Sequence, residues 1–187
     1  MAVLPAKEVA VAAHLTSRPT LSIVVPVLNE YIYLPGIITQ LAGLVPEQCI
    51  EVIFVDGGSC DGSVELLQHL SAKRIRFVES KKGRALQMNA GAAIAQGELL
   101  LFLHADTRLS QSNIRDLFHF WLSGECVWGR FDLAFDLGAF ESTAKRSETN
   151  MLVNSQIMLG SLKLVAWFIN LRSRLTGIAT GDQAIFV

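Results

Sequence analysis

The stretch ELLLFLHAD, residues 98–106, decides the expected fold, because a continuous apolar run in it ends in two polar side chains. Leu99 to Leu103 are five consecutive apolar residues, which is typical of a buried strand. In extended backbone the side chains at i and i+2 share a face, so His104 and Asp106 are expected to point together at one cation or one polyphosphate. The alternative is that Asp106 only caps the following turn and His104 lies at the rim of the sheet.

Three further apolar runs precede this one and alternate with helical patterns. The predicted strands are residues 21–27, 51–55, 75–78 and 99–103, and the predicted helices are residues 33–44, 61–70, 84–96 and 112–122. Such alternation builds βαβ units and predicts an α/β protein with a Rossmann-like, mostly parallel sheet and helices on both faces. We expect the strand order 3-2-1-4, with Gly97 as the stop signal of the third helix.

The last third of the chain follows a different pattern. Residues 129–137 alternate apolar and polar side chains, which predicts an antiparallel addition to the sheet. Residues 142–175 are expected to be mostly helical with a break at Gly160, and residues 183–187 have the composition of another buried strand on which the chain stops, as a truncated domain would. We expect a flexible tail over residues 1–20 and a single domain over residues 21–187.

Composition excludes several classes of function. Charged residues make up 18% of the 187 residues and the formal net charge is −1, whereas about 25% charged residues is usual. Without a basic stripe, nucleic-acid binding is disfavoured. The three cysteines lack a CxxC spacing and the N-terminus lacks a signal-peptide pattern, which together favour a reduced, cytoplasmic protein. No apolar run reaches the roughly 18 residues that would span a bilayer.

Polar side chains follow three of the predicted strands where each strand ends. The segments are PVLNE at residues 26–30, DGGSCDGS at residues 56–63, and HAD at residues 104–106. In open α/β sheets, ligands bind beyond the carboxyl ends of the strands, where the winding direction reverses. In the order 3-2-1-4 that point lies between strands one and four, so the three segments are expected to face one site.

In this order and spacing, these segments resemble the family 2 glycosyltransferases over residues 21–187. Two more segments, GRALQMNAG at residues 83–91 and TGDQ at residues 180–183, are similar to one bacterial branch of that family. The resemblance implies a GT-A fold and a hexosyltransferase-type enzyme. Such an enzyme passes a sugar from a nucleotide-diphosphate sugar to an acceptor hydroxyl, here in bacterial cell-surface glycan or glycolipid synthesis.

The resemblance also implies roles for individual residues. It places Asp56 against the nucleotide base and Pro26, Asn29 and Glu30 along the nucleoside pocket. Asp106 matches the second aspartate of the family's DxD element and would hold Mg²⁺ or Mn²⁺ against the diphosphate, whose developing negative charge a cation neutralises. The other predicted contacts to the nucleotide sugar are Gly58, Arg84, Asn89, His104 and Ala105.

The chain departs from the family pattern at two positions. His104 stands where the first aspartate is expected; it is a second candidate metal ligand, better suited to Mn²⁺ than to Mg²⁺, or it orients a water or a ribose hydroxyl. Gly57 stands where many relatives carry another aspartate. Near the third helix, Lys81 and Lys82 are expected to be solvated turn residues.

We expect Arg84 to be a site residue because it lies in residues 83–91, the segment similar to the bacterial branch of the family. Asn89 lies on the same helix, and packing or capping explains it equally well. The family usually supplies its catalytic base after the strand that begins near Ala184, and this chain ends first. Asp182 is the acidic residue left in that neighbourhood and the candidate catalytic residue. We expect it to contact the acceptor or the sugar rather than to serve as the base, with a plain turn as the alternative.

The apolar helix over residues 162–169, flanked by Arg172 and Arg174, could touch the inner face of a membrane that holds a lipid-linked acceptor. Packing against the sheet or against another copy in a homo-oligomer is the commoner explanation. Two other functions stay open: a non-catalytic nucleotide-sugar-binding module, and a nucleotidyltransferase. The latter lacks a glycine-rich basic loop after the first strand.

Overall fold

The computed structural model describes residues 20–44, 49–70, 74–124, 128–132, 134–135, 152–176 and 184–187, with the backbone alone over residues 152–161. The chain forms two compact units. One comprises Met1–Gly129 with Ala184–Val187, and the other comprises Arg130–Gln183. The expectation of a single domain over residues 21–187 stays a prediction.

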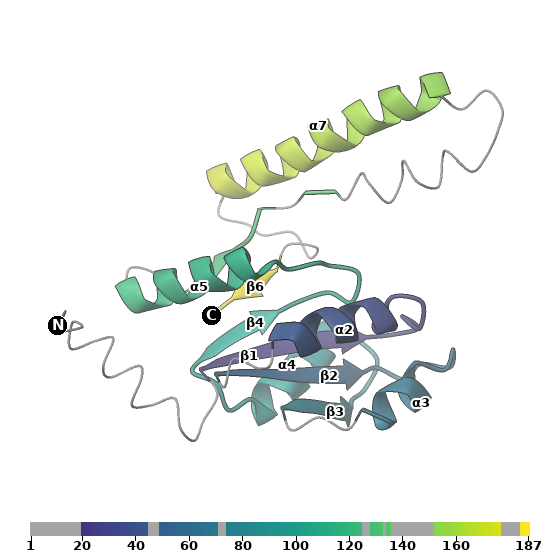
Figure 1. Ribbon diagram of the computed structural model, residues 1–187, viewed down its shortest axis with the longest axis vertical. Helices are drawn as coiled ribbons and strands as arrows, with labels where there is room; N and C mark the ends of the chain where they lie inside the picture. The colour runs from purple at the N-terminus through teal and green to yellow at the C-terminus, as the bar shows by residue number, and fades with distance from the viewer. Residues whose placement is uncertain are drawn as a thin grey trace. The chain divides into compact units, whose positions relative to one another are not determined.

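The first unit is built around a mostly parallel sheet (Figure 1). The sheet has six strands in the order β3-β2-β1-β4-β6-β5, of which β1, β2, β3 and β4 are parallel and β6 pairs antiparallel with β4. This confirms the predicted order 3-2-1-4 with an antiparallel addition. The strands are β1 Leu21–Val27, β2 Ile50–Asp56, β3 Ile75–Glu79, β4 Leu99–Phe102, β5 Gly129–Arg130 and β6 Ile185–Phe186.

Helices cover both faces of this sheet, as the apolar runs predicted. All seven residues of β2 are buried, which requires a layer on each side. Helix α4 packs against the face that carries Val24, Ile53 and Val55, and in Figure 1 it lies behind the strands while α2 lies in front. The helices of this unit are α2 Leu34–Leu44, α3 Ser63–Gln68, α4 Arg84–Ile94 and α5 Gln111–Ser123.

Two glycines allow α4 and its following loop to approach the sheet closely. A Cβ atom on Gly91 would lie 2.4 Å from Cγ1 of Val24, so a side chain there would push the helix off the strand. Gly97 is not the helix stop that the sequence suggested, because α4 ends at Ile94 with Ala95 as its C-cap. A Cβ atom on Gly97 would instead lie 2.7 Å from the backbone nitrogen of Ser22.

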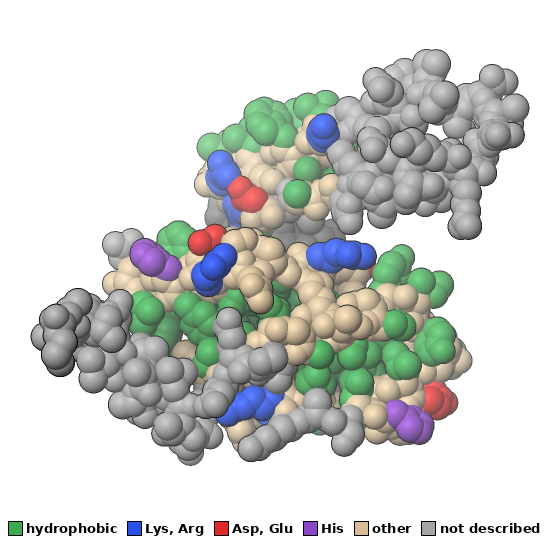
Figure 2. Space-filling view, viewed as in Figure 1, with side chains coloured by type: hydrophobic (Ala, Val, Ile, Leu, Met, Phe, Trp, Pro, Cys, Tyr) green, Lys and Arg blue, Asp and Glu red, His purple; other side chains and the backbone are tan. Residues whose placement is uncertain are grey.

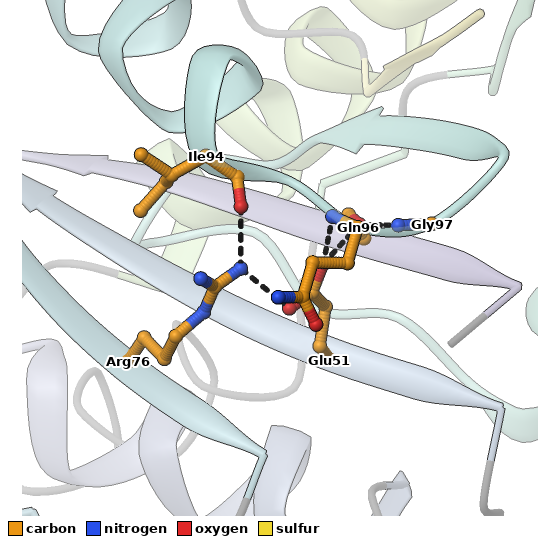
Figure 3. A network of polar contacts seen from close by, with 6 residues as sticks. Glu51, Arg76, Ile94, Gln96 and Gly97 are labelled. Atoms are coloured by element: carbon orange, nitrogen blue, oxygen red, sulfur yellow. Dashed lines mark hydrogen bonds and ion pairs between the residues drawn. The ribbon is translucent and has the colours of Figure 1, made fainter. Parts of the chain in front are cut away.

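A buried polar network holds the amino ends of the strands (Figure 3). Oε1 of Glu51 accepts hydrogen bonds from Ser22 Oγ at 2.5 Å and from the Gln96 backbone N–H at 2.6 Å. Its Oε2 pairs with Nη2 of Arg76 at 2.6 Å, and the same nitrogen donates to the Ile94 carbonyl at 2.7 Å. The network ties β1, β2 and β3 to the end of α4, far from the carboxyl ends where ligands bind.

The second unit contains α7, Leu152–Thr176, and corrects two expectations. The helix runs through Gly160 without a break, because one glycine costs a helix only about 1 kcal/mol relative to alanine. Residues 131, 132, 134 and 135 are not strand, so the predicted strand over residues 129–137 is wrong where the structure describes it beyond β5. Its polar member Asp132 instead pairs with Arg130 at 3.0 Å and with Arg174 of α7.

Several large apolar side chains of α7 are exposed, as Figure 2 shows on the surface of this unit. They are Leu164, Val165, Trp167, Phe168 and Leu175. Within the described ranges, none of the helices combines the length and the apolarity needed to cross a membrane.

Candidate active site

The loops that follow β1 and β2 are bound to each other by short polar side chains. Oδ1 of Asn29 accepts from the Cys60 backbone N–H at 2.9 Å, and the Asn29 N–H donates to Ser59 Oγ at 2.8 Å. This geometry needs Asn29 at a φ of 57°, a left-handed conformation that asparagine tolerates better than most residues. The predicted nucleoside-pocket residue Asn29 therefore holds the two loops in register.

Asp56, at the end of β2, shapes its own loop. The side chain is buried, and its Oδ2 accepts from the backbone N–H groups of Gly58 at 2.7 Å and Ser59 at 3.0 Å, while Oδ1 accepts from Ser59 Oγ at 2.5 Å. Gly58 supplies the turn with its φ of 96°. The contact of Asp56 with a nucleotide base stays a prediction.

Asp61 joins this loop to α3 and to the loop after β1. Its Oδ1 accepts from Ser63 Oγ at 2.6 Å and from the Ser63 N–H at 3.1 Å, and its Oδ2 accepts from the Tyr31 N–H at 3.0 Å. The hydrogen bond from the Ser63 hydroxyl, helped by those from the Tyr31 and Ser63 amides, lowers the pKa of Asp61. Asp61 is therefore a carboxylate that stays ionised beside the exposed Tyr31 ring.

Gln87 is a structural element of the site that the motifs did not single out. Its buried side-chain amide on α4 donates to the Val27 carbonyl at 2.6 Å and to the Val55 carbonyl at 2.9 Å. The side chain fills the space beside Gly57, where a Cβ atom would lie 2.8 Å from Cδ of Gln87. The signal available in the sequence was a lone glutamine in an alanine-rich helix, three residues after Arg84.

The segment that carries His104 and Asp106 is a turn rather than an extended strand tip. Strand β4 ends at Phe102, and the Thr107 N–H donates to the His104 carbonyl at 3.1 Å. The extended backbone from which a shared face was inferred is therefore absent, and the joint contact of the two side chains with one cation or polyphosphate stays a prediction. His104 instead meets Arg84, whose Nη2 lies 2.5 Å from Nδ1 of the imidazole.

Asp106 is exposed and lies within electrostatic range of Glu30 from the loop after β1. Desolvation raises the pKa of Glu30, and the negative charges of Asp106 and Asp61 raise it further. The carboxylate of Glu30 is thus repelled by one carboxylate from each of the other two predicted polar segments, at the carboxyl edge of the sheet. A bound cation would relieve that repulsion.

The residues present fit a cation that is held partly by a substrate. Among the described side chains, no group of three or more His, Cys, Asp and Glu is arranged to hold a metal. Mg²⁺ and similar ions are commonly bound by only one or two carboxylates together with substrate phosphates. Asp106, with Glu30 nearby, satisfies that requirement.

The remaining predicted site residues differ in burial and in position. Pro26 is half-buried in β1, and Ala105 is buried in the turn before Asp106. Asn89 is exposed about 200° around α4 from Gln87, at roughly 100° per residue, so it faces away from the sheet. Asp182 lies outside the described residues.

An open depression of about 430 Å³ lies next to the Asp61 loop. It combines an aromatic ring, two carboxylates and an imidazole on a surface formed by the loop after β1 and by α3. Its lining residues are Tyr31, Asp61, Gly62, Glu65, Leu66 and His69. Asp61 and Gly62 belong to the segment 56–63 that was expected to face the site, whereas the motifs assigned no role to Tyr31, Glu65, Leu66 or His69.

The winding of the sheet reverses between β1 and β4, and the polar loops described above lie on both sides of that point. This arrangement defines a doubly wound α/β protein, the class that binds ligands at such a switch point. The chain belongs to glycosyl transferase family 2, whose sequence model it matches over residues 22–186. This match confirms the family that the sequence motifs indicated.

Two curated relatives show the extent of the sequence similarity. A Haemophilus influenzae protein described as an uncharacterized glycosyltransferase is 32% identical over 124 residues, covering 64% of this chain and 49% of the relative. An undecaprenyl-phosphate 4-deoxy-4-formamido-L-arabinose transferase of Yersinia pestis is 32% identical over 142 residues, covering 71% of this chain and 42% of the relative. The chain thus spans less than half the length of either protein.

One solved structure supports the GT-A fold. A mannosyltransferase from Pyrobaculum calidifontis, in complex with GDP-Man and Mn²⁺, aligns with a TM-score of 0.56 over 92% of this chain and 45% of its own, at 20% identity. At this level of identity the likeness concerns the fold.

Proposed function

We propose that the protein transfers a sugar from a nucleotide-diphosphate sugar to an acceptor hydroxyl in the synthesis of a bacterial cell-surface glycan or glycolipid. The observation that supports this most is the match to glycosyl transferase family 2 over residues 22–186. The polar loops after β1, β2 and β4 end at the same edge of the sheet, which supports a donor site there.

In this proposal, Asp106 holds a divalent cation, Mg²⁺ or Mn²⁺, against the diphosphate. The cation would neutralise the charge that develops on the leaving nucleoside diphosphate. The attraction of a cation to the site is supported by the raised pKa of Glu30, which desolvation and then the negative charges of Asp106 and Asp61 cause. Pro26, Asn29, Glu30, Asp56 and Gly58 would surround the nucleoside, and Asp182 would contact the acceptor or the sugar.

Donor binding is tested with a panel of UDP-, GDP-, CDP- and dTDP-sugars, measured by calorimetry with Mn²⁺ present. One member of the panel is expected to bind, and Asp106→Asn is expected to weaken that binding by about 10-fold or more, as the loss of a charged ligand does. The matched control is Glu98→Gln, because Glu98 is an exposed acid at the opposite end of β4.

Failure of the whole panel to bind wild-type protein would remove the proposal. Binding without sugar transfer to any acceptor would instead favour the alternative of a non-catalytic nucleotide-sugar-binding module. Release of pyrophosphate from a nucleoside triphosphate and a sugar phosphate would favour nucleotidyltransfer.

The acceptor is proposed to be lipid-linked, and the protein to work at the cytoplasmic face of a membrane. Support comes from the Yersinia relative, whose name includes undecaprenyl phosphate, and from α7, where Trp167 and Phe168 are exposed next to Arg172. Aromatic and basic side chains on one helix suit the interface of an anionic bilayer.

Sedimentation with vesicles tests this membrane contact. Wild-type protein is expected to co-sediment with phosphatidylglycerol vesicles more than with phosphatidylcholine vesicles, and the pair Trp167→Ser and Phe168→Ser should abolish the difference. Phe120→Ser on α5 is the control, because Phe120 is 51% exposed, close to the 55% of Trp167 and the 56% of Phe168. Equal loss in the control and in the α7 variant would contradict a specific role for α7.

A further inference from the structure

Three consecutive large apolar side chains are exposed where the loop after β1 leads into α2. Tyr31 is 47% exposed, Ile32 86% and Tyr33 52%. Single exposed apolar residues are ordinary on a protein surface, whereas a contiguous group that borders polar residues is typical of an interaction site. Figure 2 shows hydrophobic side chains gathered next to an acidic and a histidine side chain over α3. Residues 31–33 are therefore a candidate for contact with another molecule.

Tyr31 is held in place although its ring is exposed. Its backbone N–H donates to Oδ2 of Asp61 at 3.0 Å. A Cβ atom on Gly62 would lie 3.3 Å from Cδ2 and from Cε2 of the ring, so the ring packs directly against the glycine. The ring thus forms one wall of the depression next to α3 in the free protein, and this preorganisation lowers the entropy cost of binding.

The charged groups that line this depression are all negative. Asp61 and Glu65 are exposed carboxylates, and within the described ranges neither has an ion-pair partner. Nδ1 of His69 lies 2.6 Å from the Glu65 carbonyl, which can only accept, so Nδ1 carries the proton and Nε2 of the neutral ring is an acceptor. Carboxylates, an acceptor nitrogen and an aromatic ring together match a cationic group that donates hydrogen bonds.

The occupant that suits this surface best is a basic side chain of another protein. Nucleic acid and an anionic bilayer are disfavoured because the carboxylates repel them. Among the described side chains, no three His, Cys, Asp or Glu are arranged to hold a metal. The depression is also open, whereas a small-molecule site encloses most of its ligand. A side chain presented by a second protein surface needs no such enclosure.

We propose that residues 31–33 and the depression next to α3 form a docking surface for a protein partner that presents an arginine beside an apolar residue. The guanidinium would contact the Tyr31 ring and the carboxylates of Asp61 and Glu65, and the apolar neighbour would cover Ile32. Arginine suits this surface better than lysine, because its planar group stacks on aromatic rings and pairs with carboxylates at the same time. Partner binding is measured without a nucleotide sugar, so it is tested separately from the proposed function.

Amide NMR of the full chain with short acetylated peptides tests the docking surface. One peptide carries arginine followed by leucine at its centre. The matched peptides carry citrulline and leucine, which removes the charge, or arginine and serine, which removes the apolar side chain. The arginine–leucine peptide is expected to shift the amides of Tyr31, Gly62 and Glu65 saturably, and to bind about 10-fold more tightly than the citrulline–leucine peptide.

Two surface variants assign the two halves of the contact. Glu65→Gln should weaken the arginine–leucine peptide about 2- to 5-fold, as the loss of an exposed ion pair does, and should narrow its advantage over the citrulline–leucine peptide. Ile32→Ser should weaken it about 5-fold or more and should remove its advantage over the arginine–serine peptide. Glu98→Gln and Phe120→Ser, at exposed residues elsewhere, are the matched controls. Urea unfolding verifies that all four variants are folded.

Four outcomes would overturn the docking surface. They are the absence of saturable shifts with the arginine–leucine peptide, equal binding of the citrulline–leucine peptide, Glu65→Gln and Ile32→Ser variants that bind like the controls, and free arginine amide that binds as tightly as the peptide. The last result would assign the depression to a small cation. A dimer in analytical ultracentrifugation that Ile32→Ser dissociates would also overturn the proposal, because it would assign the surface to a second copy of this chain.

Discussion

A Cβ atom on Gly57 would lie 2.8 Å from Cδ of Gln87, so the glycine and the glutamine are coupled through shared space. The space that a side chain at position 57 would need is occupied by the side chain of Gln87. The glycine is therefore required by packing between the β2 loop and α4.

Gly57→Asp is expected to lower the free energy of unfolding by about 1–3 kcal/mol, the usual cost of overpacking. Urea denaturation measures the change. In a Gln87→Ala background the same substitution should cost clearly less, because the obstructing amide is gone. Equal cost in both backgrounds would show that the two positions are independent.

Gly43→Ala is the matched control for this substitution. A Cβ atom on Gly43 in α2 would have no neighbour within 4 Å. The change should leave stability unaltered or raise it by up to about 1 kcal/mol, since alanine is the better helix former.

Two substitutions at Asn29 distinguish the contribution of its backbone conformation to stability from that of its side-chain hydrogen bond. Asn29→Gly keeps the left-handed φ of 57° without strain but loses the bond to the Cys60 N–H, and should cost about 1 kcal/mol. Asn29→Ala loses the same bond and adds about 1–2 kcal/mol of backbone strain. Thermal and urea unfolding should therefore rank wild type above glycine and glycine above alanine; an alanine variant as stable as the glycine variant would contradict the strain.

Glu51 is expected to be the polar side chain whose loss harms folding most. Glu51→Ala leaves the Gln96 N–H and the Ser22 hydroxyl without their acceptor and Arg76 without its partner, which should cost about 3 kcal/mol. Guanidinium denaturation gives the value. Because the network lies at the amino ends of the strands, nucleotide affinity of the folded variant should equal that of wild type; a specific loss of affinity would refute this separation.

The raised pKa of Glu30 predicts how the stability of the protein changes with pH. Desolvation, then the charges of Asp106 and Asp61, hold the pKa of Glu30 above its ordinary value of 4.5. The native protein thus binds more protons than the unfolded chain between the two values, and the stability contributed by Glu30 is lost as the pH rises through that window.

Asp106→Asn should lower the pKa of Glu30, measured by carboxyl NMR titration, because it removes one of the repelling charges. Glu98→Gln should leave that pKa in place. A Glu30 pKa that is the same in Asp106→Asn and in wild type would show that the two carboxylates do not interact.

The sequence by itself determined the layers of this protein. Four apolar runs that alternate with helical patterns require a parallel sheet covered on both faces, and the structure has the expected order β3-β2-β1-β4. Predictions from neighbouring residues in the sequence were less reliable where a residue has a tertiary contact. Gly97 was predicted to end a helix, but it lies close to Ser22, where a side chain would not fit. The alternation after Gly129 predicted a strand, but Asp132 instead forms ion pairs with Arg130 and Arg174.

Only the tertiary structure decided how the candidate site is assembled. Hydrophobic periodicity depends on neighbours along the chain, so it can be recognised in one dimension. The pairs that define the site join residues 20 or more positions apart: Arg84 with His104, Asn29 with Cys60, and Gln87 with the Val27 carbonyl. Which donor meets which acceptor depends on the approach of α4 to the sheet and on the turn after β4, and these exist only once the chain has folded.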